Sequence, residues 1–234
     1  MMEDRPRTVD WGALPGRSPV DGAEPSLRER KKRLMRQQLS DTATEMFLSR
    51  GFDAVRVVEV AEACGVSEKT VYNYFPTKES LLLDRWDTTM ASIRTGLADA
   101  ALSPVQAALR ILTEELWSLT SWLAVQDDPV AACALYQRFG EMIHATPSLR
   151  AHQRDVTDTL IGVASEVLAR RAGLTPDEPE PQLAATAIVG LWQVQSASLR
   201  RHLDGDAPEQ VRAAVTAEVM RAAETLDAGL HSFG

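Results

Sequence analysis

Helix-breaking pairs and loops that contain proline divide the second half of this sequence into helix-length segments. Between these breakers the pattern of residues is helical throughout. Runs of alternating β-branched residues between turn signals, which indicate strands, are absent. The chain is therefore predicted to be all-α. The dividing points are Ser103-Pro104, Asp128-Pro129, Thr146-Pro147, residues 176–181 and residues 204–208, and helices are expected near 104–125, 129–145, 147–172, 182–203 and 208–230.

The first half of the chain carries the pattern of a helix-turn-helix. Its second helix should stop at Gly65, and Ser67 is a good N-cap for the short helix that follows. Two short helices joined by a three-residue turn that contains glycine are typical of this motif. Pro76 ends the third helix, and Thr77 is expected to cap the next. Helices are predicted over residues 28–51, within 55–67, over 68–75 and from 78 towards 101.

These patterns divide the chain into three parts. Residues 1–26 contain four prolines and no helical periodicity, so a disordered tail is expected there. We expect an N-terminal three-helix domain over residues 27–84, with its motif at about 56–75, and a C-terminal helical bundle over residues 85–234. The start of the sequence carries no secretory signal, and the longest uncharged run, Leu183–Leu199, falls short of a membrane span of roughly 20 apolar residues. A soluble, cytoplasmic protein with two free, buried cysteines is predicted.

The charge of the chain is unevenly distributed. The net charge is −8, but residues 27–85 carry 11 basic against 9 acidic side chains, whereas residues 86–234 carry 11 against 19. Six cations gather in the first turns of the first predicted helix, where they oppose the helix dipole and a nearby polyanion would explain them better: Arg28, Arg30, Lys31, Lys32, Arg33 and Arg36. This asymmetry indicates a nucleic-acid-binding head on an acidic body.

The third predicted helix has one buried edge and a polar outer surface. On a helical wheel Val71 and Phe75 fall together, whereas Lys69, Thr70, Asn73 and Tyr74 point away from them and Tyr72 lies on a flank. In a DNA major groove, Asn reads adenine edges and Thr contacts a base edge or a thymine methyl group. Tyr hydroxyls and Lys amines suit phosphate oxygens. The helix therefore has the side chains of a DNA-recognition helix.

Residues 51–82 resemble the DNA-binding domain of the tetracycline-repressor family. This resemblance implies a homodimeric transcription regulator, usually a repressor, with a three-helix head and a larger helical body for ligand binding and dimerisation. A small-molecule effector in the body would release a palindromic operator in double-stranded DNA. The matching elements are Gly51-Phe52, Val60-Ala61, Ala63, Gly65-Val66-Ser67, Thr70-Val71-Tyr72, Tyr74-Phe75 and Lys78-Glu79 before Leu81-Leu82.

The resemblance also assigns DNA contacts by position. One departure is at Val55 and Arg56, where the family usually has a capping Thr or Ser, and Arg56 is expected to supply the phosphate contact instead. The expected DNA-binding residues are Arg56, Ser67, Glu68, Lys69, Thr70, Tyr72, Asn73, Tyr74, Thr77 and Lys78, with a basic arm of Arg28, Arg30, Lys31, Lys32 and Arg33.

The body is expected to hold the effector site and the dimer contact. Aromatic side chains with polar tips are typical of ligand pockets, and each is also ordinary core material. Packing of the last two helices against a second subunit is what the resemblance implies for the dimer. The ligand-binding candidates are Trp86, Trp117, Trp122, Tyr136 and His144, and the dimer candidates are Leu191, Trp192, Val215, Val219 and Leu226.

Two alternative interpretations remain from the residues alone. Glu141 and His144 have the Glu-x-x-His spacing of helical di-iron carboxylate enzymes, but such sites need a second pair of the same kind, which the sequence lacks. A helical protein that does not bind DNA is the other alternative, and the polar residues of the third helix argue against it. No cofactor or metal is expected.

Overall fold

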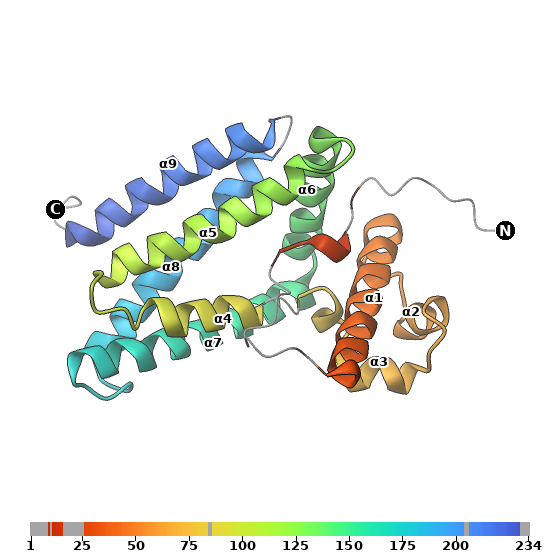
Figure 1. Cartoon of the computed structure of the whole chain (residues 1–234), viewed down its shortest axis with the longest axis horizontal. Coiled ribbons are helices and arrows are strands. Elements are labelled where there is room, and N and C mark those ends of the chain that lie inside the picture. Colours follow the sequence, from red (N-terminus) through yellow and green to blue (C-terminus); the bar gives the residue numbers. More distant parts are fainter. Residues whose placement is uncertain (1–8, 10, 16–25, 84–85, 204–205, 230–234) are drawn as a thin grey trace.

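The structure is a computed structural model that describes residues 9, 11–15, 26–83, 86–203 and 206–229. Within these ranges it is all-α, without a strand, as predicted (Figure 1). The elements are η1 (Trp11–Ala13), α1 (Leu27–Arg50), α2 (Val57–Ala63), α3 (Glu68–Tyr74), η2 (Glu79–Leu81), α4 (Trp86–Gly96), α5 (Pro104–Ala124), α6 (Pro129–Ala145), α7 (Pro147–Ala172), α8 (Pro179–His202) and α9 (Pro208–Asp227), where η denotes a 3-10 helix.

Helices α1 to α3 form a small head whose buried side chains belong to the main hydrophobic cluster. A reciprocal pair starts α1: the Glu29 amide donates to the Ser26 hydroxyl, and the Ser26 amide donates to the Glu29 carboxylate. The helix buries a stripe that includes Phe47, and α2 and α3 contribute Val60 and Val71 to the same cluster. The head is thus organised around side chains at helical spacing, as the sequence indicates.

The turn between α2 and α3 has the predicted geometry. Gly65 has φ +67°, a left-handed conformation that glycine adopts without the steric cost of a Cβ. The Ser67 hydroxyl accepts a hydrogen bond from the Thr70 amide at 3.1 Å and so caps α3. This turn fixes the direction in which α3 leaves the head.

The predicted single helix from residue 78 towards 101 is wrong. The chain instead forms the short η2 and then α4, which ends at Gly96. Leu81, Leu82 and Leu83 are all buried, at 0%, 2% and 7% exposure. Three consecutive residues cannot share the inward face of a surface helix, so the chain turns to bury all three. The boundary expected between residues 84 and 85 lies outside the described residues.

The body consists of α4 to α9, and α5 to α9 lie close to their predicted bounds. Helix α8 packs along both α7 and α9, and α9 also packs along α5. Figure 1 shows α5, α8 and α9 as neighbouring long helices at the end of the molecule away from the head. Caps explain the agreement in part: the Ser103 hydroxyl accepts from the Gln106 amide, and the Asp128 carboxylate accepts from the Ala131 amide.

The N-terminal tail is not disordered where the structure describes it. Val9, Trp11 and Leu14 are buried, at 3%, 3% and 5% exposure, and belong to the main hydrophobic cluster. The rest of the predicted tail, residues 1–8, 10 and 16–25, lies outside the described residues. Aromatic burial outweighs the loop-like composition around Trp11, because one buried indole removes roughly 150–250 Å² from water.

Two simpler expectations can also be compared with the structure. Cys64 and Cys133 are both buried and free, as predicted, and burial raises the pKa of the Cys133 thiol to about 11. Within the described ranges, none of the helices combines the length and apolar character that crossing a bilayer requires.

Candidate nucleic-acid interface and ligand-binding body

Helix α3 presents a polar surface that is held in place by two buried side chains. Val71 and Phe75 are fully buried in the head. The exposed residues are Glu68, Lys69, Tyr72 and Asn73, while Thr70 and Tyr74 are half-buried. The division between a buried edge and a polar surface follows the helical wheel derived from the sequence.

Ser67 and Thr70 are engaged with each other at the start of α3. Their hydroxyl oxygens lie 2.8 Å apart, and the Thr70 amide also donates to the Ser67 hydroxyl. Ser67 therefore acts first as the helix cap. The hydroxyl of Thr70 is shared with that cap, so part of its hydrogen-bonding capacity is used within the head.

Arg36 was grouped by the sequence interpretation with the cations at the start of the first helix, but its side chain turns into the head. Its guanidinium donates to the Tyr74 carbonyl at 2.7 Å and stacks 4.5 Å above the Phe75 ring. Arg36 thus caps the carboxyl end of α3 from α1. Helical spacing could have indicated this inward position. Arg36 precedes the buried Leu39 and Ala43 by three and seven residues and so shares their helix face.

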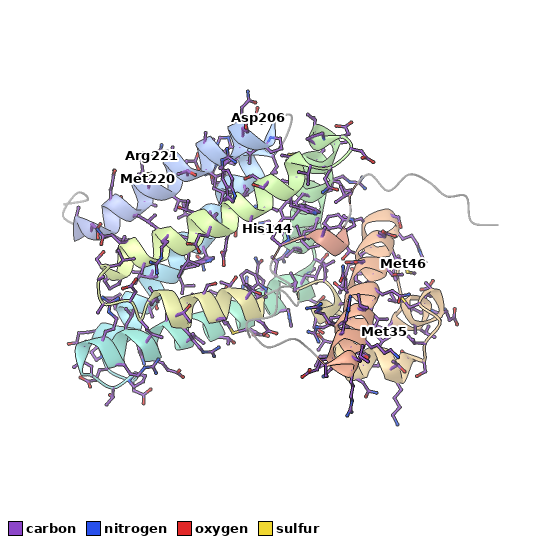
Figure 2. The ribbon with its side chains drawn as sticks, viewed as in Figure 1. Met35, Met46, His144, Asp206, Met220 and Arg221 are labelled. Carbon is purple, nitrogen blue, oxygen red and sulfur yellow. The ribbon has the colours of Figure 1, made fainter. Side chains whose placement is uncertain are left out.

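The predicted basic arm lies next to α3. The Arg36 contacts bring the first half of α1 beside the end of α3, and Figure 2 marks Met35 in the part of α1 nearest to α3 and Met46 towards its other end. All five arm side chains are exposed: Arg28, Arg30, Lys31, Lys32 and Arg33. The arm therefore lies one to two turns of α1 before Arg36, the residue that contacts the end of α3.

Lys78 is directed into the head rather than to solvent. Its amine donates to the Phe52 carbonyl at 2.5 Å and lies 4.3 Å from the Phe52 ring centre and 5.5 Å from that of Phe47. Burial lowers the pKa of Lys78, against the opposing effect of nearby carboxylates such as Asp53. The expected outward position on a DNA phosphate is thus corrected: the amine holds η2 to the end of α1.

The two remaining candidates of the head are on the surface. The Arg56 side chain is 78% exposed and lies 3.7 Å from Glu59, whose carboxylate accepts from the Arg56 amide at 2.8 Å. That bond starts α2 without a capping Ser or Thr. Thr77 is exposed, and its hydroxyl oxygen accepts from the Ser80 amide at 3.1 Å, although Lys78 rather than Thr77 holds the N-cap position of η2.

The predicted ligand-binding aromatics separate into two groups. Trp122 and Tyr136 lie together, with ring centres 6.2 Å apart, and Trp86 is half-buried against the core. Trp117, by contrast, is 57% exposed beneath the Arg212 guanidinium at 4.4 Å, and His144 is exposed. Trp117 and His144 therefore do not line the interior of the body, and that part of the prediction is corrected.

Glu115 is a buried carboxylate that the sequence interpretation missed. One oxygen accepts from the Thr89 hydroxyl at 2.8 Å and the other from the Trp192 indole N–H at 2.9 Å. Burial raises the pKa of Glu115, and the two hydrogen bonds partly oppose this. Glu115 joins α4, α5 and α8 at a polar centre within the body. Its position next to Glu114 in an ordinary amphipathic pattern gave no sequence signal.

Four of the predicted dimer residues belong to the core of a single subunit. Leu191, Trp192, Val215 and Val219 are between 0% and 7% exposed, whereas Leu226 is half-buried. The four cannot form the outer contact, and this correction has a simple reason. The last two helices use their most apolar stripes to pack on each other and on α5.

The metal-binding alternative has no support in the described ranges. They contain no group of three or more His, Cys, Asp and Glu side chains that could hold a metal ion. Glu141 and His144 are both exposed on α6.

Comparison with known proteins covers both parts of the chain. Residues 39–84 match the family profile described as bacterial regulatory proteins, tetR family, and residues 125–229 match that of the MftR C-terminal domain. The chain is 26% identical to the putative mycofactocin biosynthesis transcriptional regulator MftR of Mycobacterium tuberculosis, over 69% of this chain and 78% of the relative. It is 27% identical to the regulator TcmR of Streptomyces glaucescens, over 78% and 80%.

A further relative and a solved structure complete the comparison. The transcriptional activator FasR of Mycolicibacterium smegmatis is 27% identical over 79% of each chain. The crystal structure of NalD, the secondary repressor of the MexAB-OprM multidrug efflux pump in Pseudomonas aeruginosa, has a TM-score of 0.52 at 18% identity, over 82% of this chain and 97% of NalD. The likeness to NalD is one of fold.

A helix-turn-helix head with an exposed polar third helix, joined to a helical bundle, defines a DNA-binding transcriptional regulator. The two matched profiles and the named relatives place it more closely: the chain belongs to the tetracycline-repressor family. Proteins of this family are regulators that respond to ligands and are not enzymes.

Proposed function

We propose that the chain acts as a homodimeric repressor that places α3 in the major groove of a palindromic operator and leaves it when a small molecule binds the body. The observation that carries the proposal is the exposed polar face of α3, fixed by the buried Val71 and Phe75. In this proposal residues 27–84 are the DNA-binding head and residues 85–234 the sensing and dimerising body, and the regulator works in the cytoplasm, where its DNA is.

Each exposed residue of α3 suits a different part of DNA. Asn73 can pair with an adenine edge, Lys69 with guanine, and Glu68 with the amino group of cytosine. Tyr72 and Tyr74 suit phosphate oxygens, which position the helix without reading sequence. Lys78 has a supporting role in this proposal, because its amine is engaged with Phe52.

The basic arm supplies affinity that does not depend on sequence. Replacing Arg28, Arg30, Lys31, Lys32 and Arg33 with Gln should flatten the dependence of log K on log salt concentration. Each lost phosphate contact reduces the slope by about 0.9. Fluorescence anisotropy between low and moderate salt measures the slope. An unchanged slope would remove the arm from the interface.

The effector is proposed to bind in the body, where Trp86, Thr89, Glu115 and Trp192 come from three different helices. A ligand that binds a conformation with misplaced heads more tightly shifts the population away from DNA. Among the named similar proteins NalD is a repressor and FasR an activator, and release on ligand binding is the simpler mechanism for a chain with one sensing body.

The dimer contact is proposed on the outer sides of α8 and α9. Leu183 on α8 and Met220 on α9 are 73% and 50% exposed, although both are large and apolar. Exposed apolar side chains on long helices suit a self-complementary contact about a two-fold axis. Two heads related by that axis would address two half-sites about one turn of DNA apart.

Selection of genomic fragments by the purified full-length protein tests the proposal. The selected fragment is then titrated with wild type, Asn73→Ala and Lys69→Ala, with Arg94→Ala on the exposed surface of α4 as a matched control. Loss of a base contact should weaken binding by about 1–3 kcal/mol, and the control should bind as wild type does. Equal affinity of all four proteins, or no fragment enriched, would refute the proposal.

A further inference from the structure

The N-terminal segment, described at Val9 and over residues 11–14, inserts an indole ring into an aromatic cluster of the body. Trp11 lies 5.9 Å from Trp122 of α5 and 5.5 Å from Phe139 of α6, between ring centres. Behind this contact Tyr136 stacks on Phe139 at 5.8 Å and meets the edge of Trp122 at 6.2 Å. Three of the four rings thus come from two fixed helices, and the fourth comes from an N-terminal segment.

The burial of this segment exceeds what a surface tail needs. Val9, Trp11 and Leu14 are each at most 5% exposed. The backbone forms only a short 3-10 turn, closed by the Leu14 amide donating to the Trp11 carbonyl at 3.2 Å. Such a turn contributes few hydrogen bonds, so the packing of the three side chains carries the attachment.

The same segment lies at the junction of head and body. η1 packs against α1 of the head, while Trp11 contacts α5 and α6 of the body. Figure 1 shows η1 between α1 and α6. A direct contact of the two parts is close by, since the Arg138 guanidinium of α6 donates to the Leu48 carbonyl of α1 at 3.3 Å. Anything that removes Trp11 from its site therefore removes part of what fixes α1 to the body.

We propose that Val9 and residues 11–14 are an internal ligand: the Trp11 indole occupies an aromatic binding site on α5 and α6, and small planar aromatic molecules compete with it and free α1 from the body. The chemistry of the site selects this class, because Trp122 and Phe139 offer ring faces and edges to a flat apolar group. The added molecule and the Trp11 indole compete because both would occupy the same site on α5 and α6. The effect of releasing α1 rests on the proposed function, in which the head must keep its orientation to bind DNA.

The test uses indole and the full-length chain with Trp11→Ala. The substitution opens an indole-sized site, and apolar cavities of this kind bind matching aromatic molecules. Indole should bind Trp11→Ala more tightly than wild type, because no internal ring competes. At about ten times its Kd it should raise the Tm of the variant by about 3–5 °C. Trp117→Ala, which removes a 57% exposed indole elsewhere, is the matched control and should behave as wild type.

A second variant and a second measurement keep the test decisive. Trp11→Leu retains apolar bulk and should bind indole with an affinity between those of wild type and Trp11→Ala. In the wild type, saturating indole should increase amide hydrogen exchange in residues 11–15 and in the part of α1 that η1 covers. Equal indole affinity in wild type and both Trp11 variants, or no change in exchange, would overturn the inference.

DNA binding separates this inference from the proposed function. Trp11→Ala should bind the selected operator fragment about fivefold or more weakly, in the usual range of coupling between sites. Tighter indole binding without any DNA binding by the wild type would refute only the proposed function. Normal DNA binding by Trp11→Ala, despite its gain in indole affinity, would refute the coupling and leave the regulator intact.

Discussion

Two lysines of the head, nine residues apart, have opposite environments. Lys69 is exposed on α3, whereas Lys78 directs its amine to the Phe52 carbonyl and two phenyl rings. Both were expected on DNA from sequence position, since a lysine that follows a recognition helix resembles a phosphate contact. Only the fold separates them, because the turn at η2 rotates Lys78 inward. A basic residue close to the recognition helix can therefore stabilise the fold of the head instead of contacting DNA.

Replacing each lysine with Ala should separate these two roles. Lys78→Ala loses a charged hydrogen bond and the ring contacts and should reduce the free energy of unfolding by about 1–3 kcal/mol. Lys69→Ala should leave stability within about 0.5 kcal/mol of wild type and weaken DNA binding. Urea unfolding followed by circular dichroism gives the first quantity. Equal stability of both variants would contradict the inward role of Lys78.

Glu115 gives the body a stability that depends on pH. Because burial raises its pKa above the ordinary value of 4.5, the folded chain holds a proton that the unfolded chain releases as the pH rises above 4.5. The native state therefore loses stability with rising pH until the raised pKa is passed.

Glu115→Gln should remove this dependence. Gln can still accept from the Trp192 indole and donate to the Thr89 hydroxyl, without a titrating group. The free energy of unfolding of Glu115→Gln, minus that of the wild type, should increase as the pH rises from 4.5 to 8. Urea denaturation at a series of pH values measures the difference. Glu141→Gln, at an exposed carboxylate of α6, should keep the wild-type profile, and a difference between Glu115→Gln and wild type that does not change with pH would contradict this role of Glu115.

At the scale of elements, the agreement between sequence and structure follows local chemistry. Ser26, Ser67, Ser103 and Asp128 cap the helices that they precede, and a proline begins each of α5 to α9. Such signals act over four residues and are readable without a fold. The burial and contacts of three other features could not be read in this way, because their packing partners are distant in the sequence: Leu81–Leu83, Trp11 and Arg36. Their environment is set by tertiary packing, which no local pattern contains.

The glycine in the turn between α2 and α3 has a matched control inside α7. Gly65→Ala places a Cβ on a left-handed residue and should cost about 1–2 kcal/mol, although its Cβ would meet no atom within 4 Å. Gly162→Ala, inside α7 with equally open space, should gain about 0.5–1 kcal/mol from helix propensity. Thermal unfolding compares the two. A stability gain at Gly65 would show that the turn does not need its left-handed conformation.

At the scale of the whole molecule, the single subunit already completes its core. The packing of α8 on α9 is reinforced by Glu218, which interacts with both His202 and Arg201. Hydrogen bonds from these partners, His202 first, lower the pKa of Glu218 to about 2. The stripes expected to meet a second subunit are used within the first. The proposed dimer contact is therefore made by the exposed apolar side chains on the outside of α8 and α9.

Leu183→Glu combined with Met220→Glu should convert the dimer to a folded monomer. Figure 2 marks Met220 on α9 at the edge of the molecule, and the exposure of both side chains means that the subunit core is unchanged. Sedimentation velocity at micromolar concentration measures the change. Val125→Glu, at a 79% exposed apolar residue after α5, should remain dimeric. A dimeric double variant would move the contact elsewhere.

The completed core of the subunit has a genetic consequence. Chains that are fully folded before they meet can exchange partners without unfolding, so two alleles in one cell would produce mixed pairs. A copy with Asn73→Ala and Lys69→Ala would still assemble, and each mixed pair would present only one competent α3 to a two-part site. Such an allele should be dominant over the normal gene, whereas one that also carries the Leu183 and Met220 substitutions should be recessive.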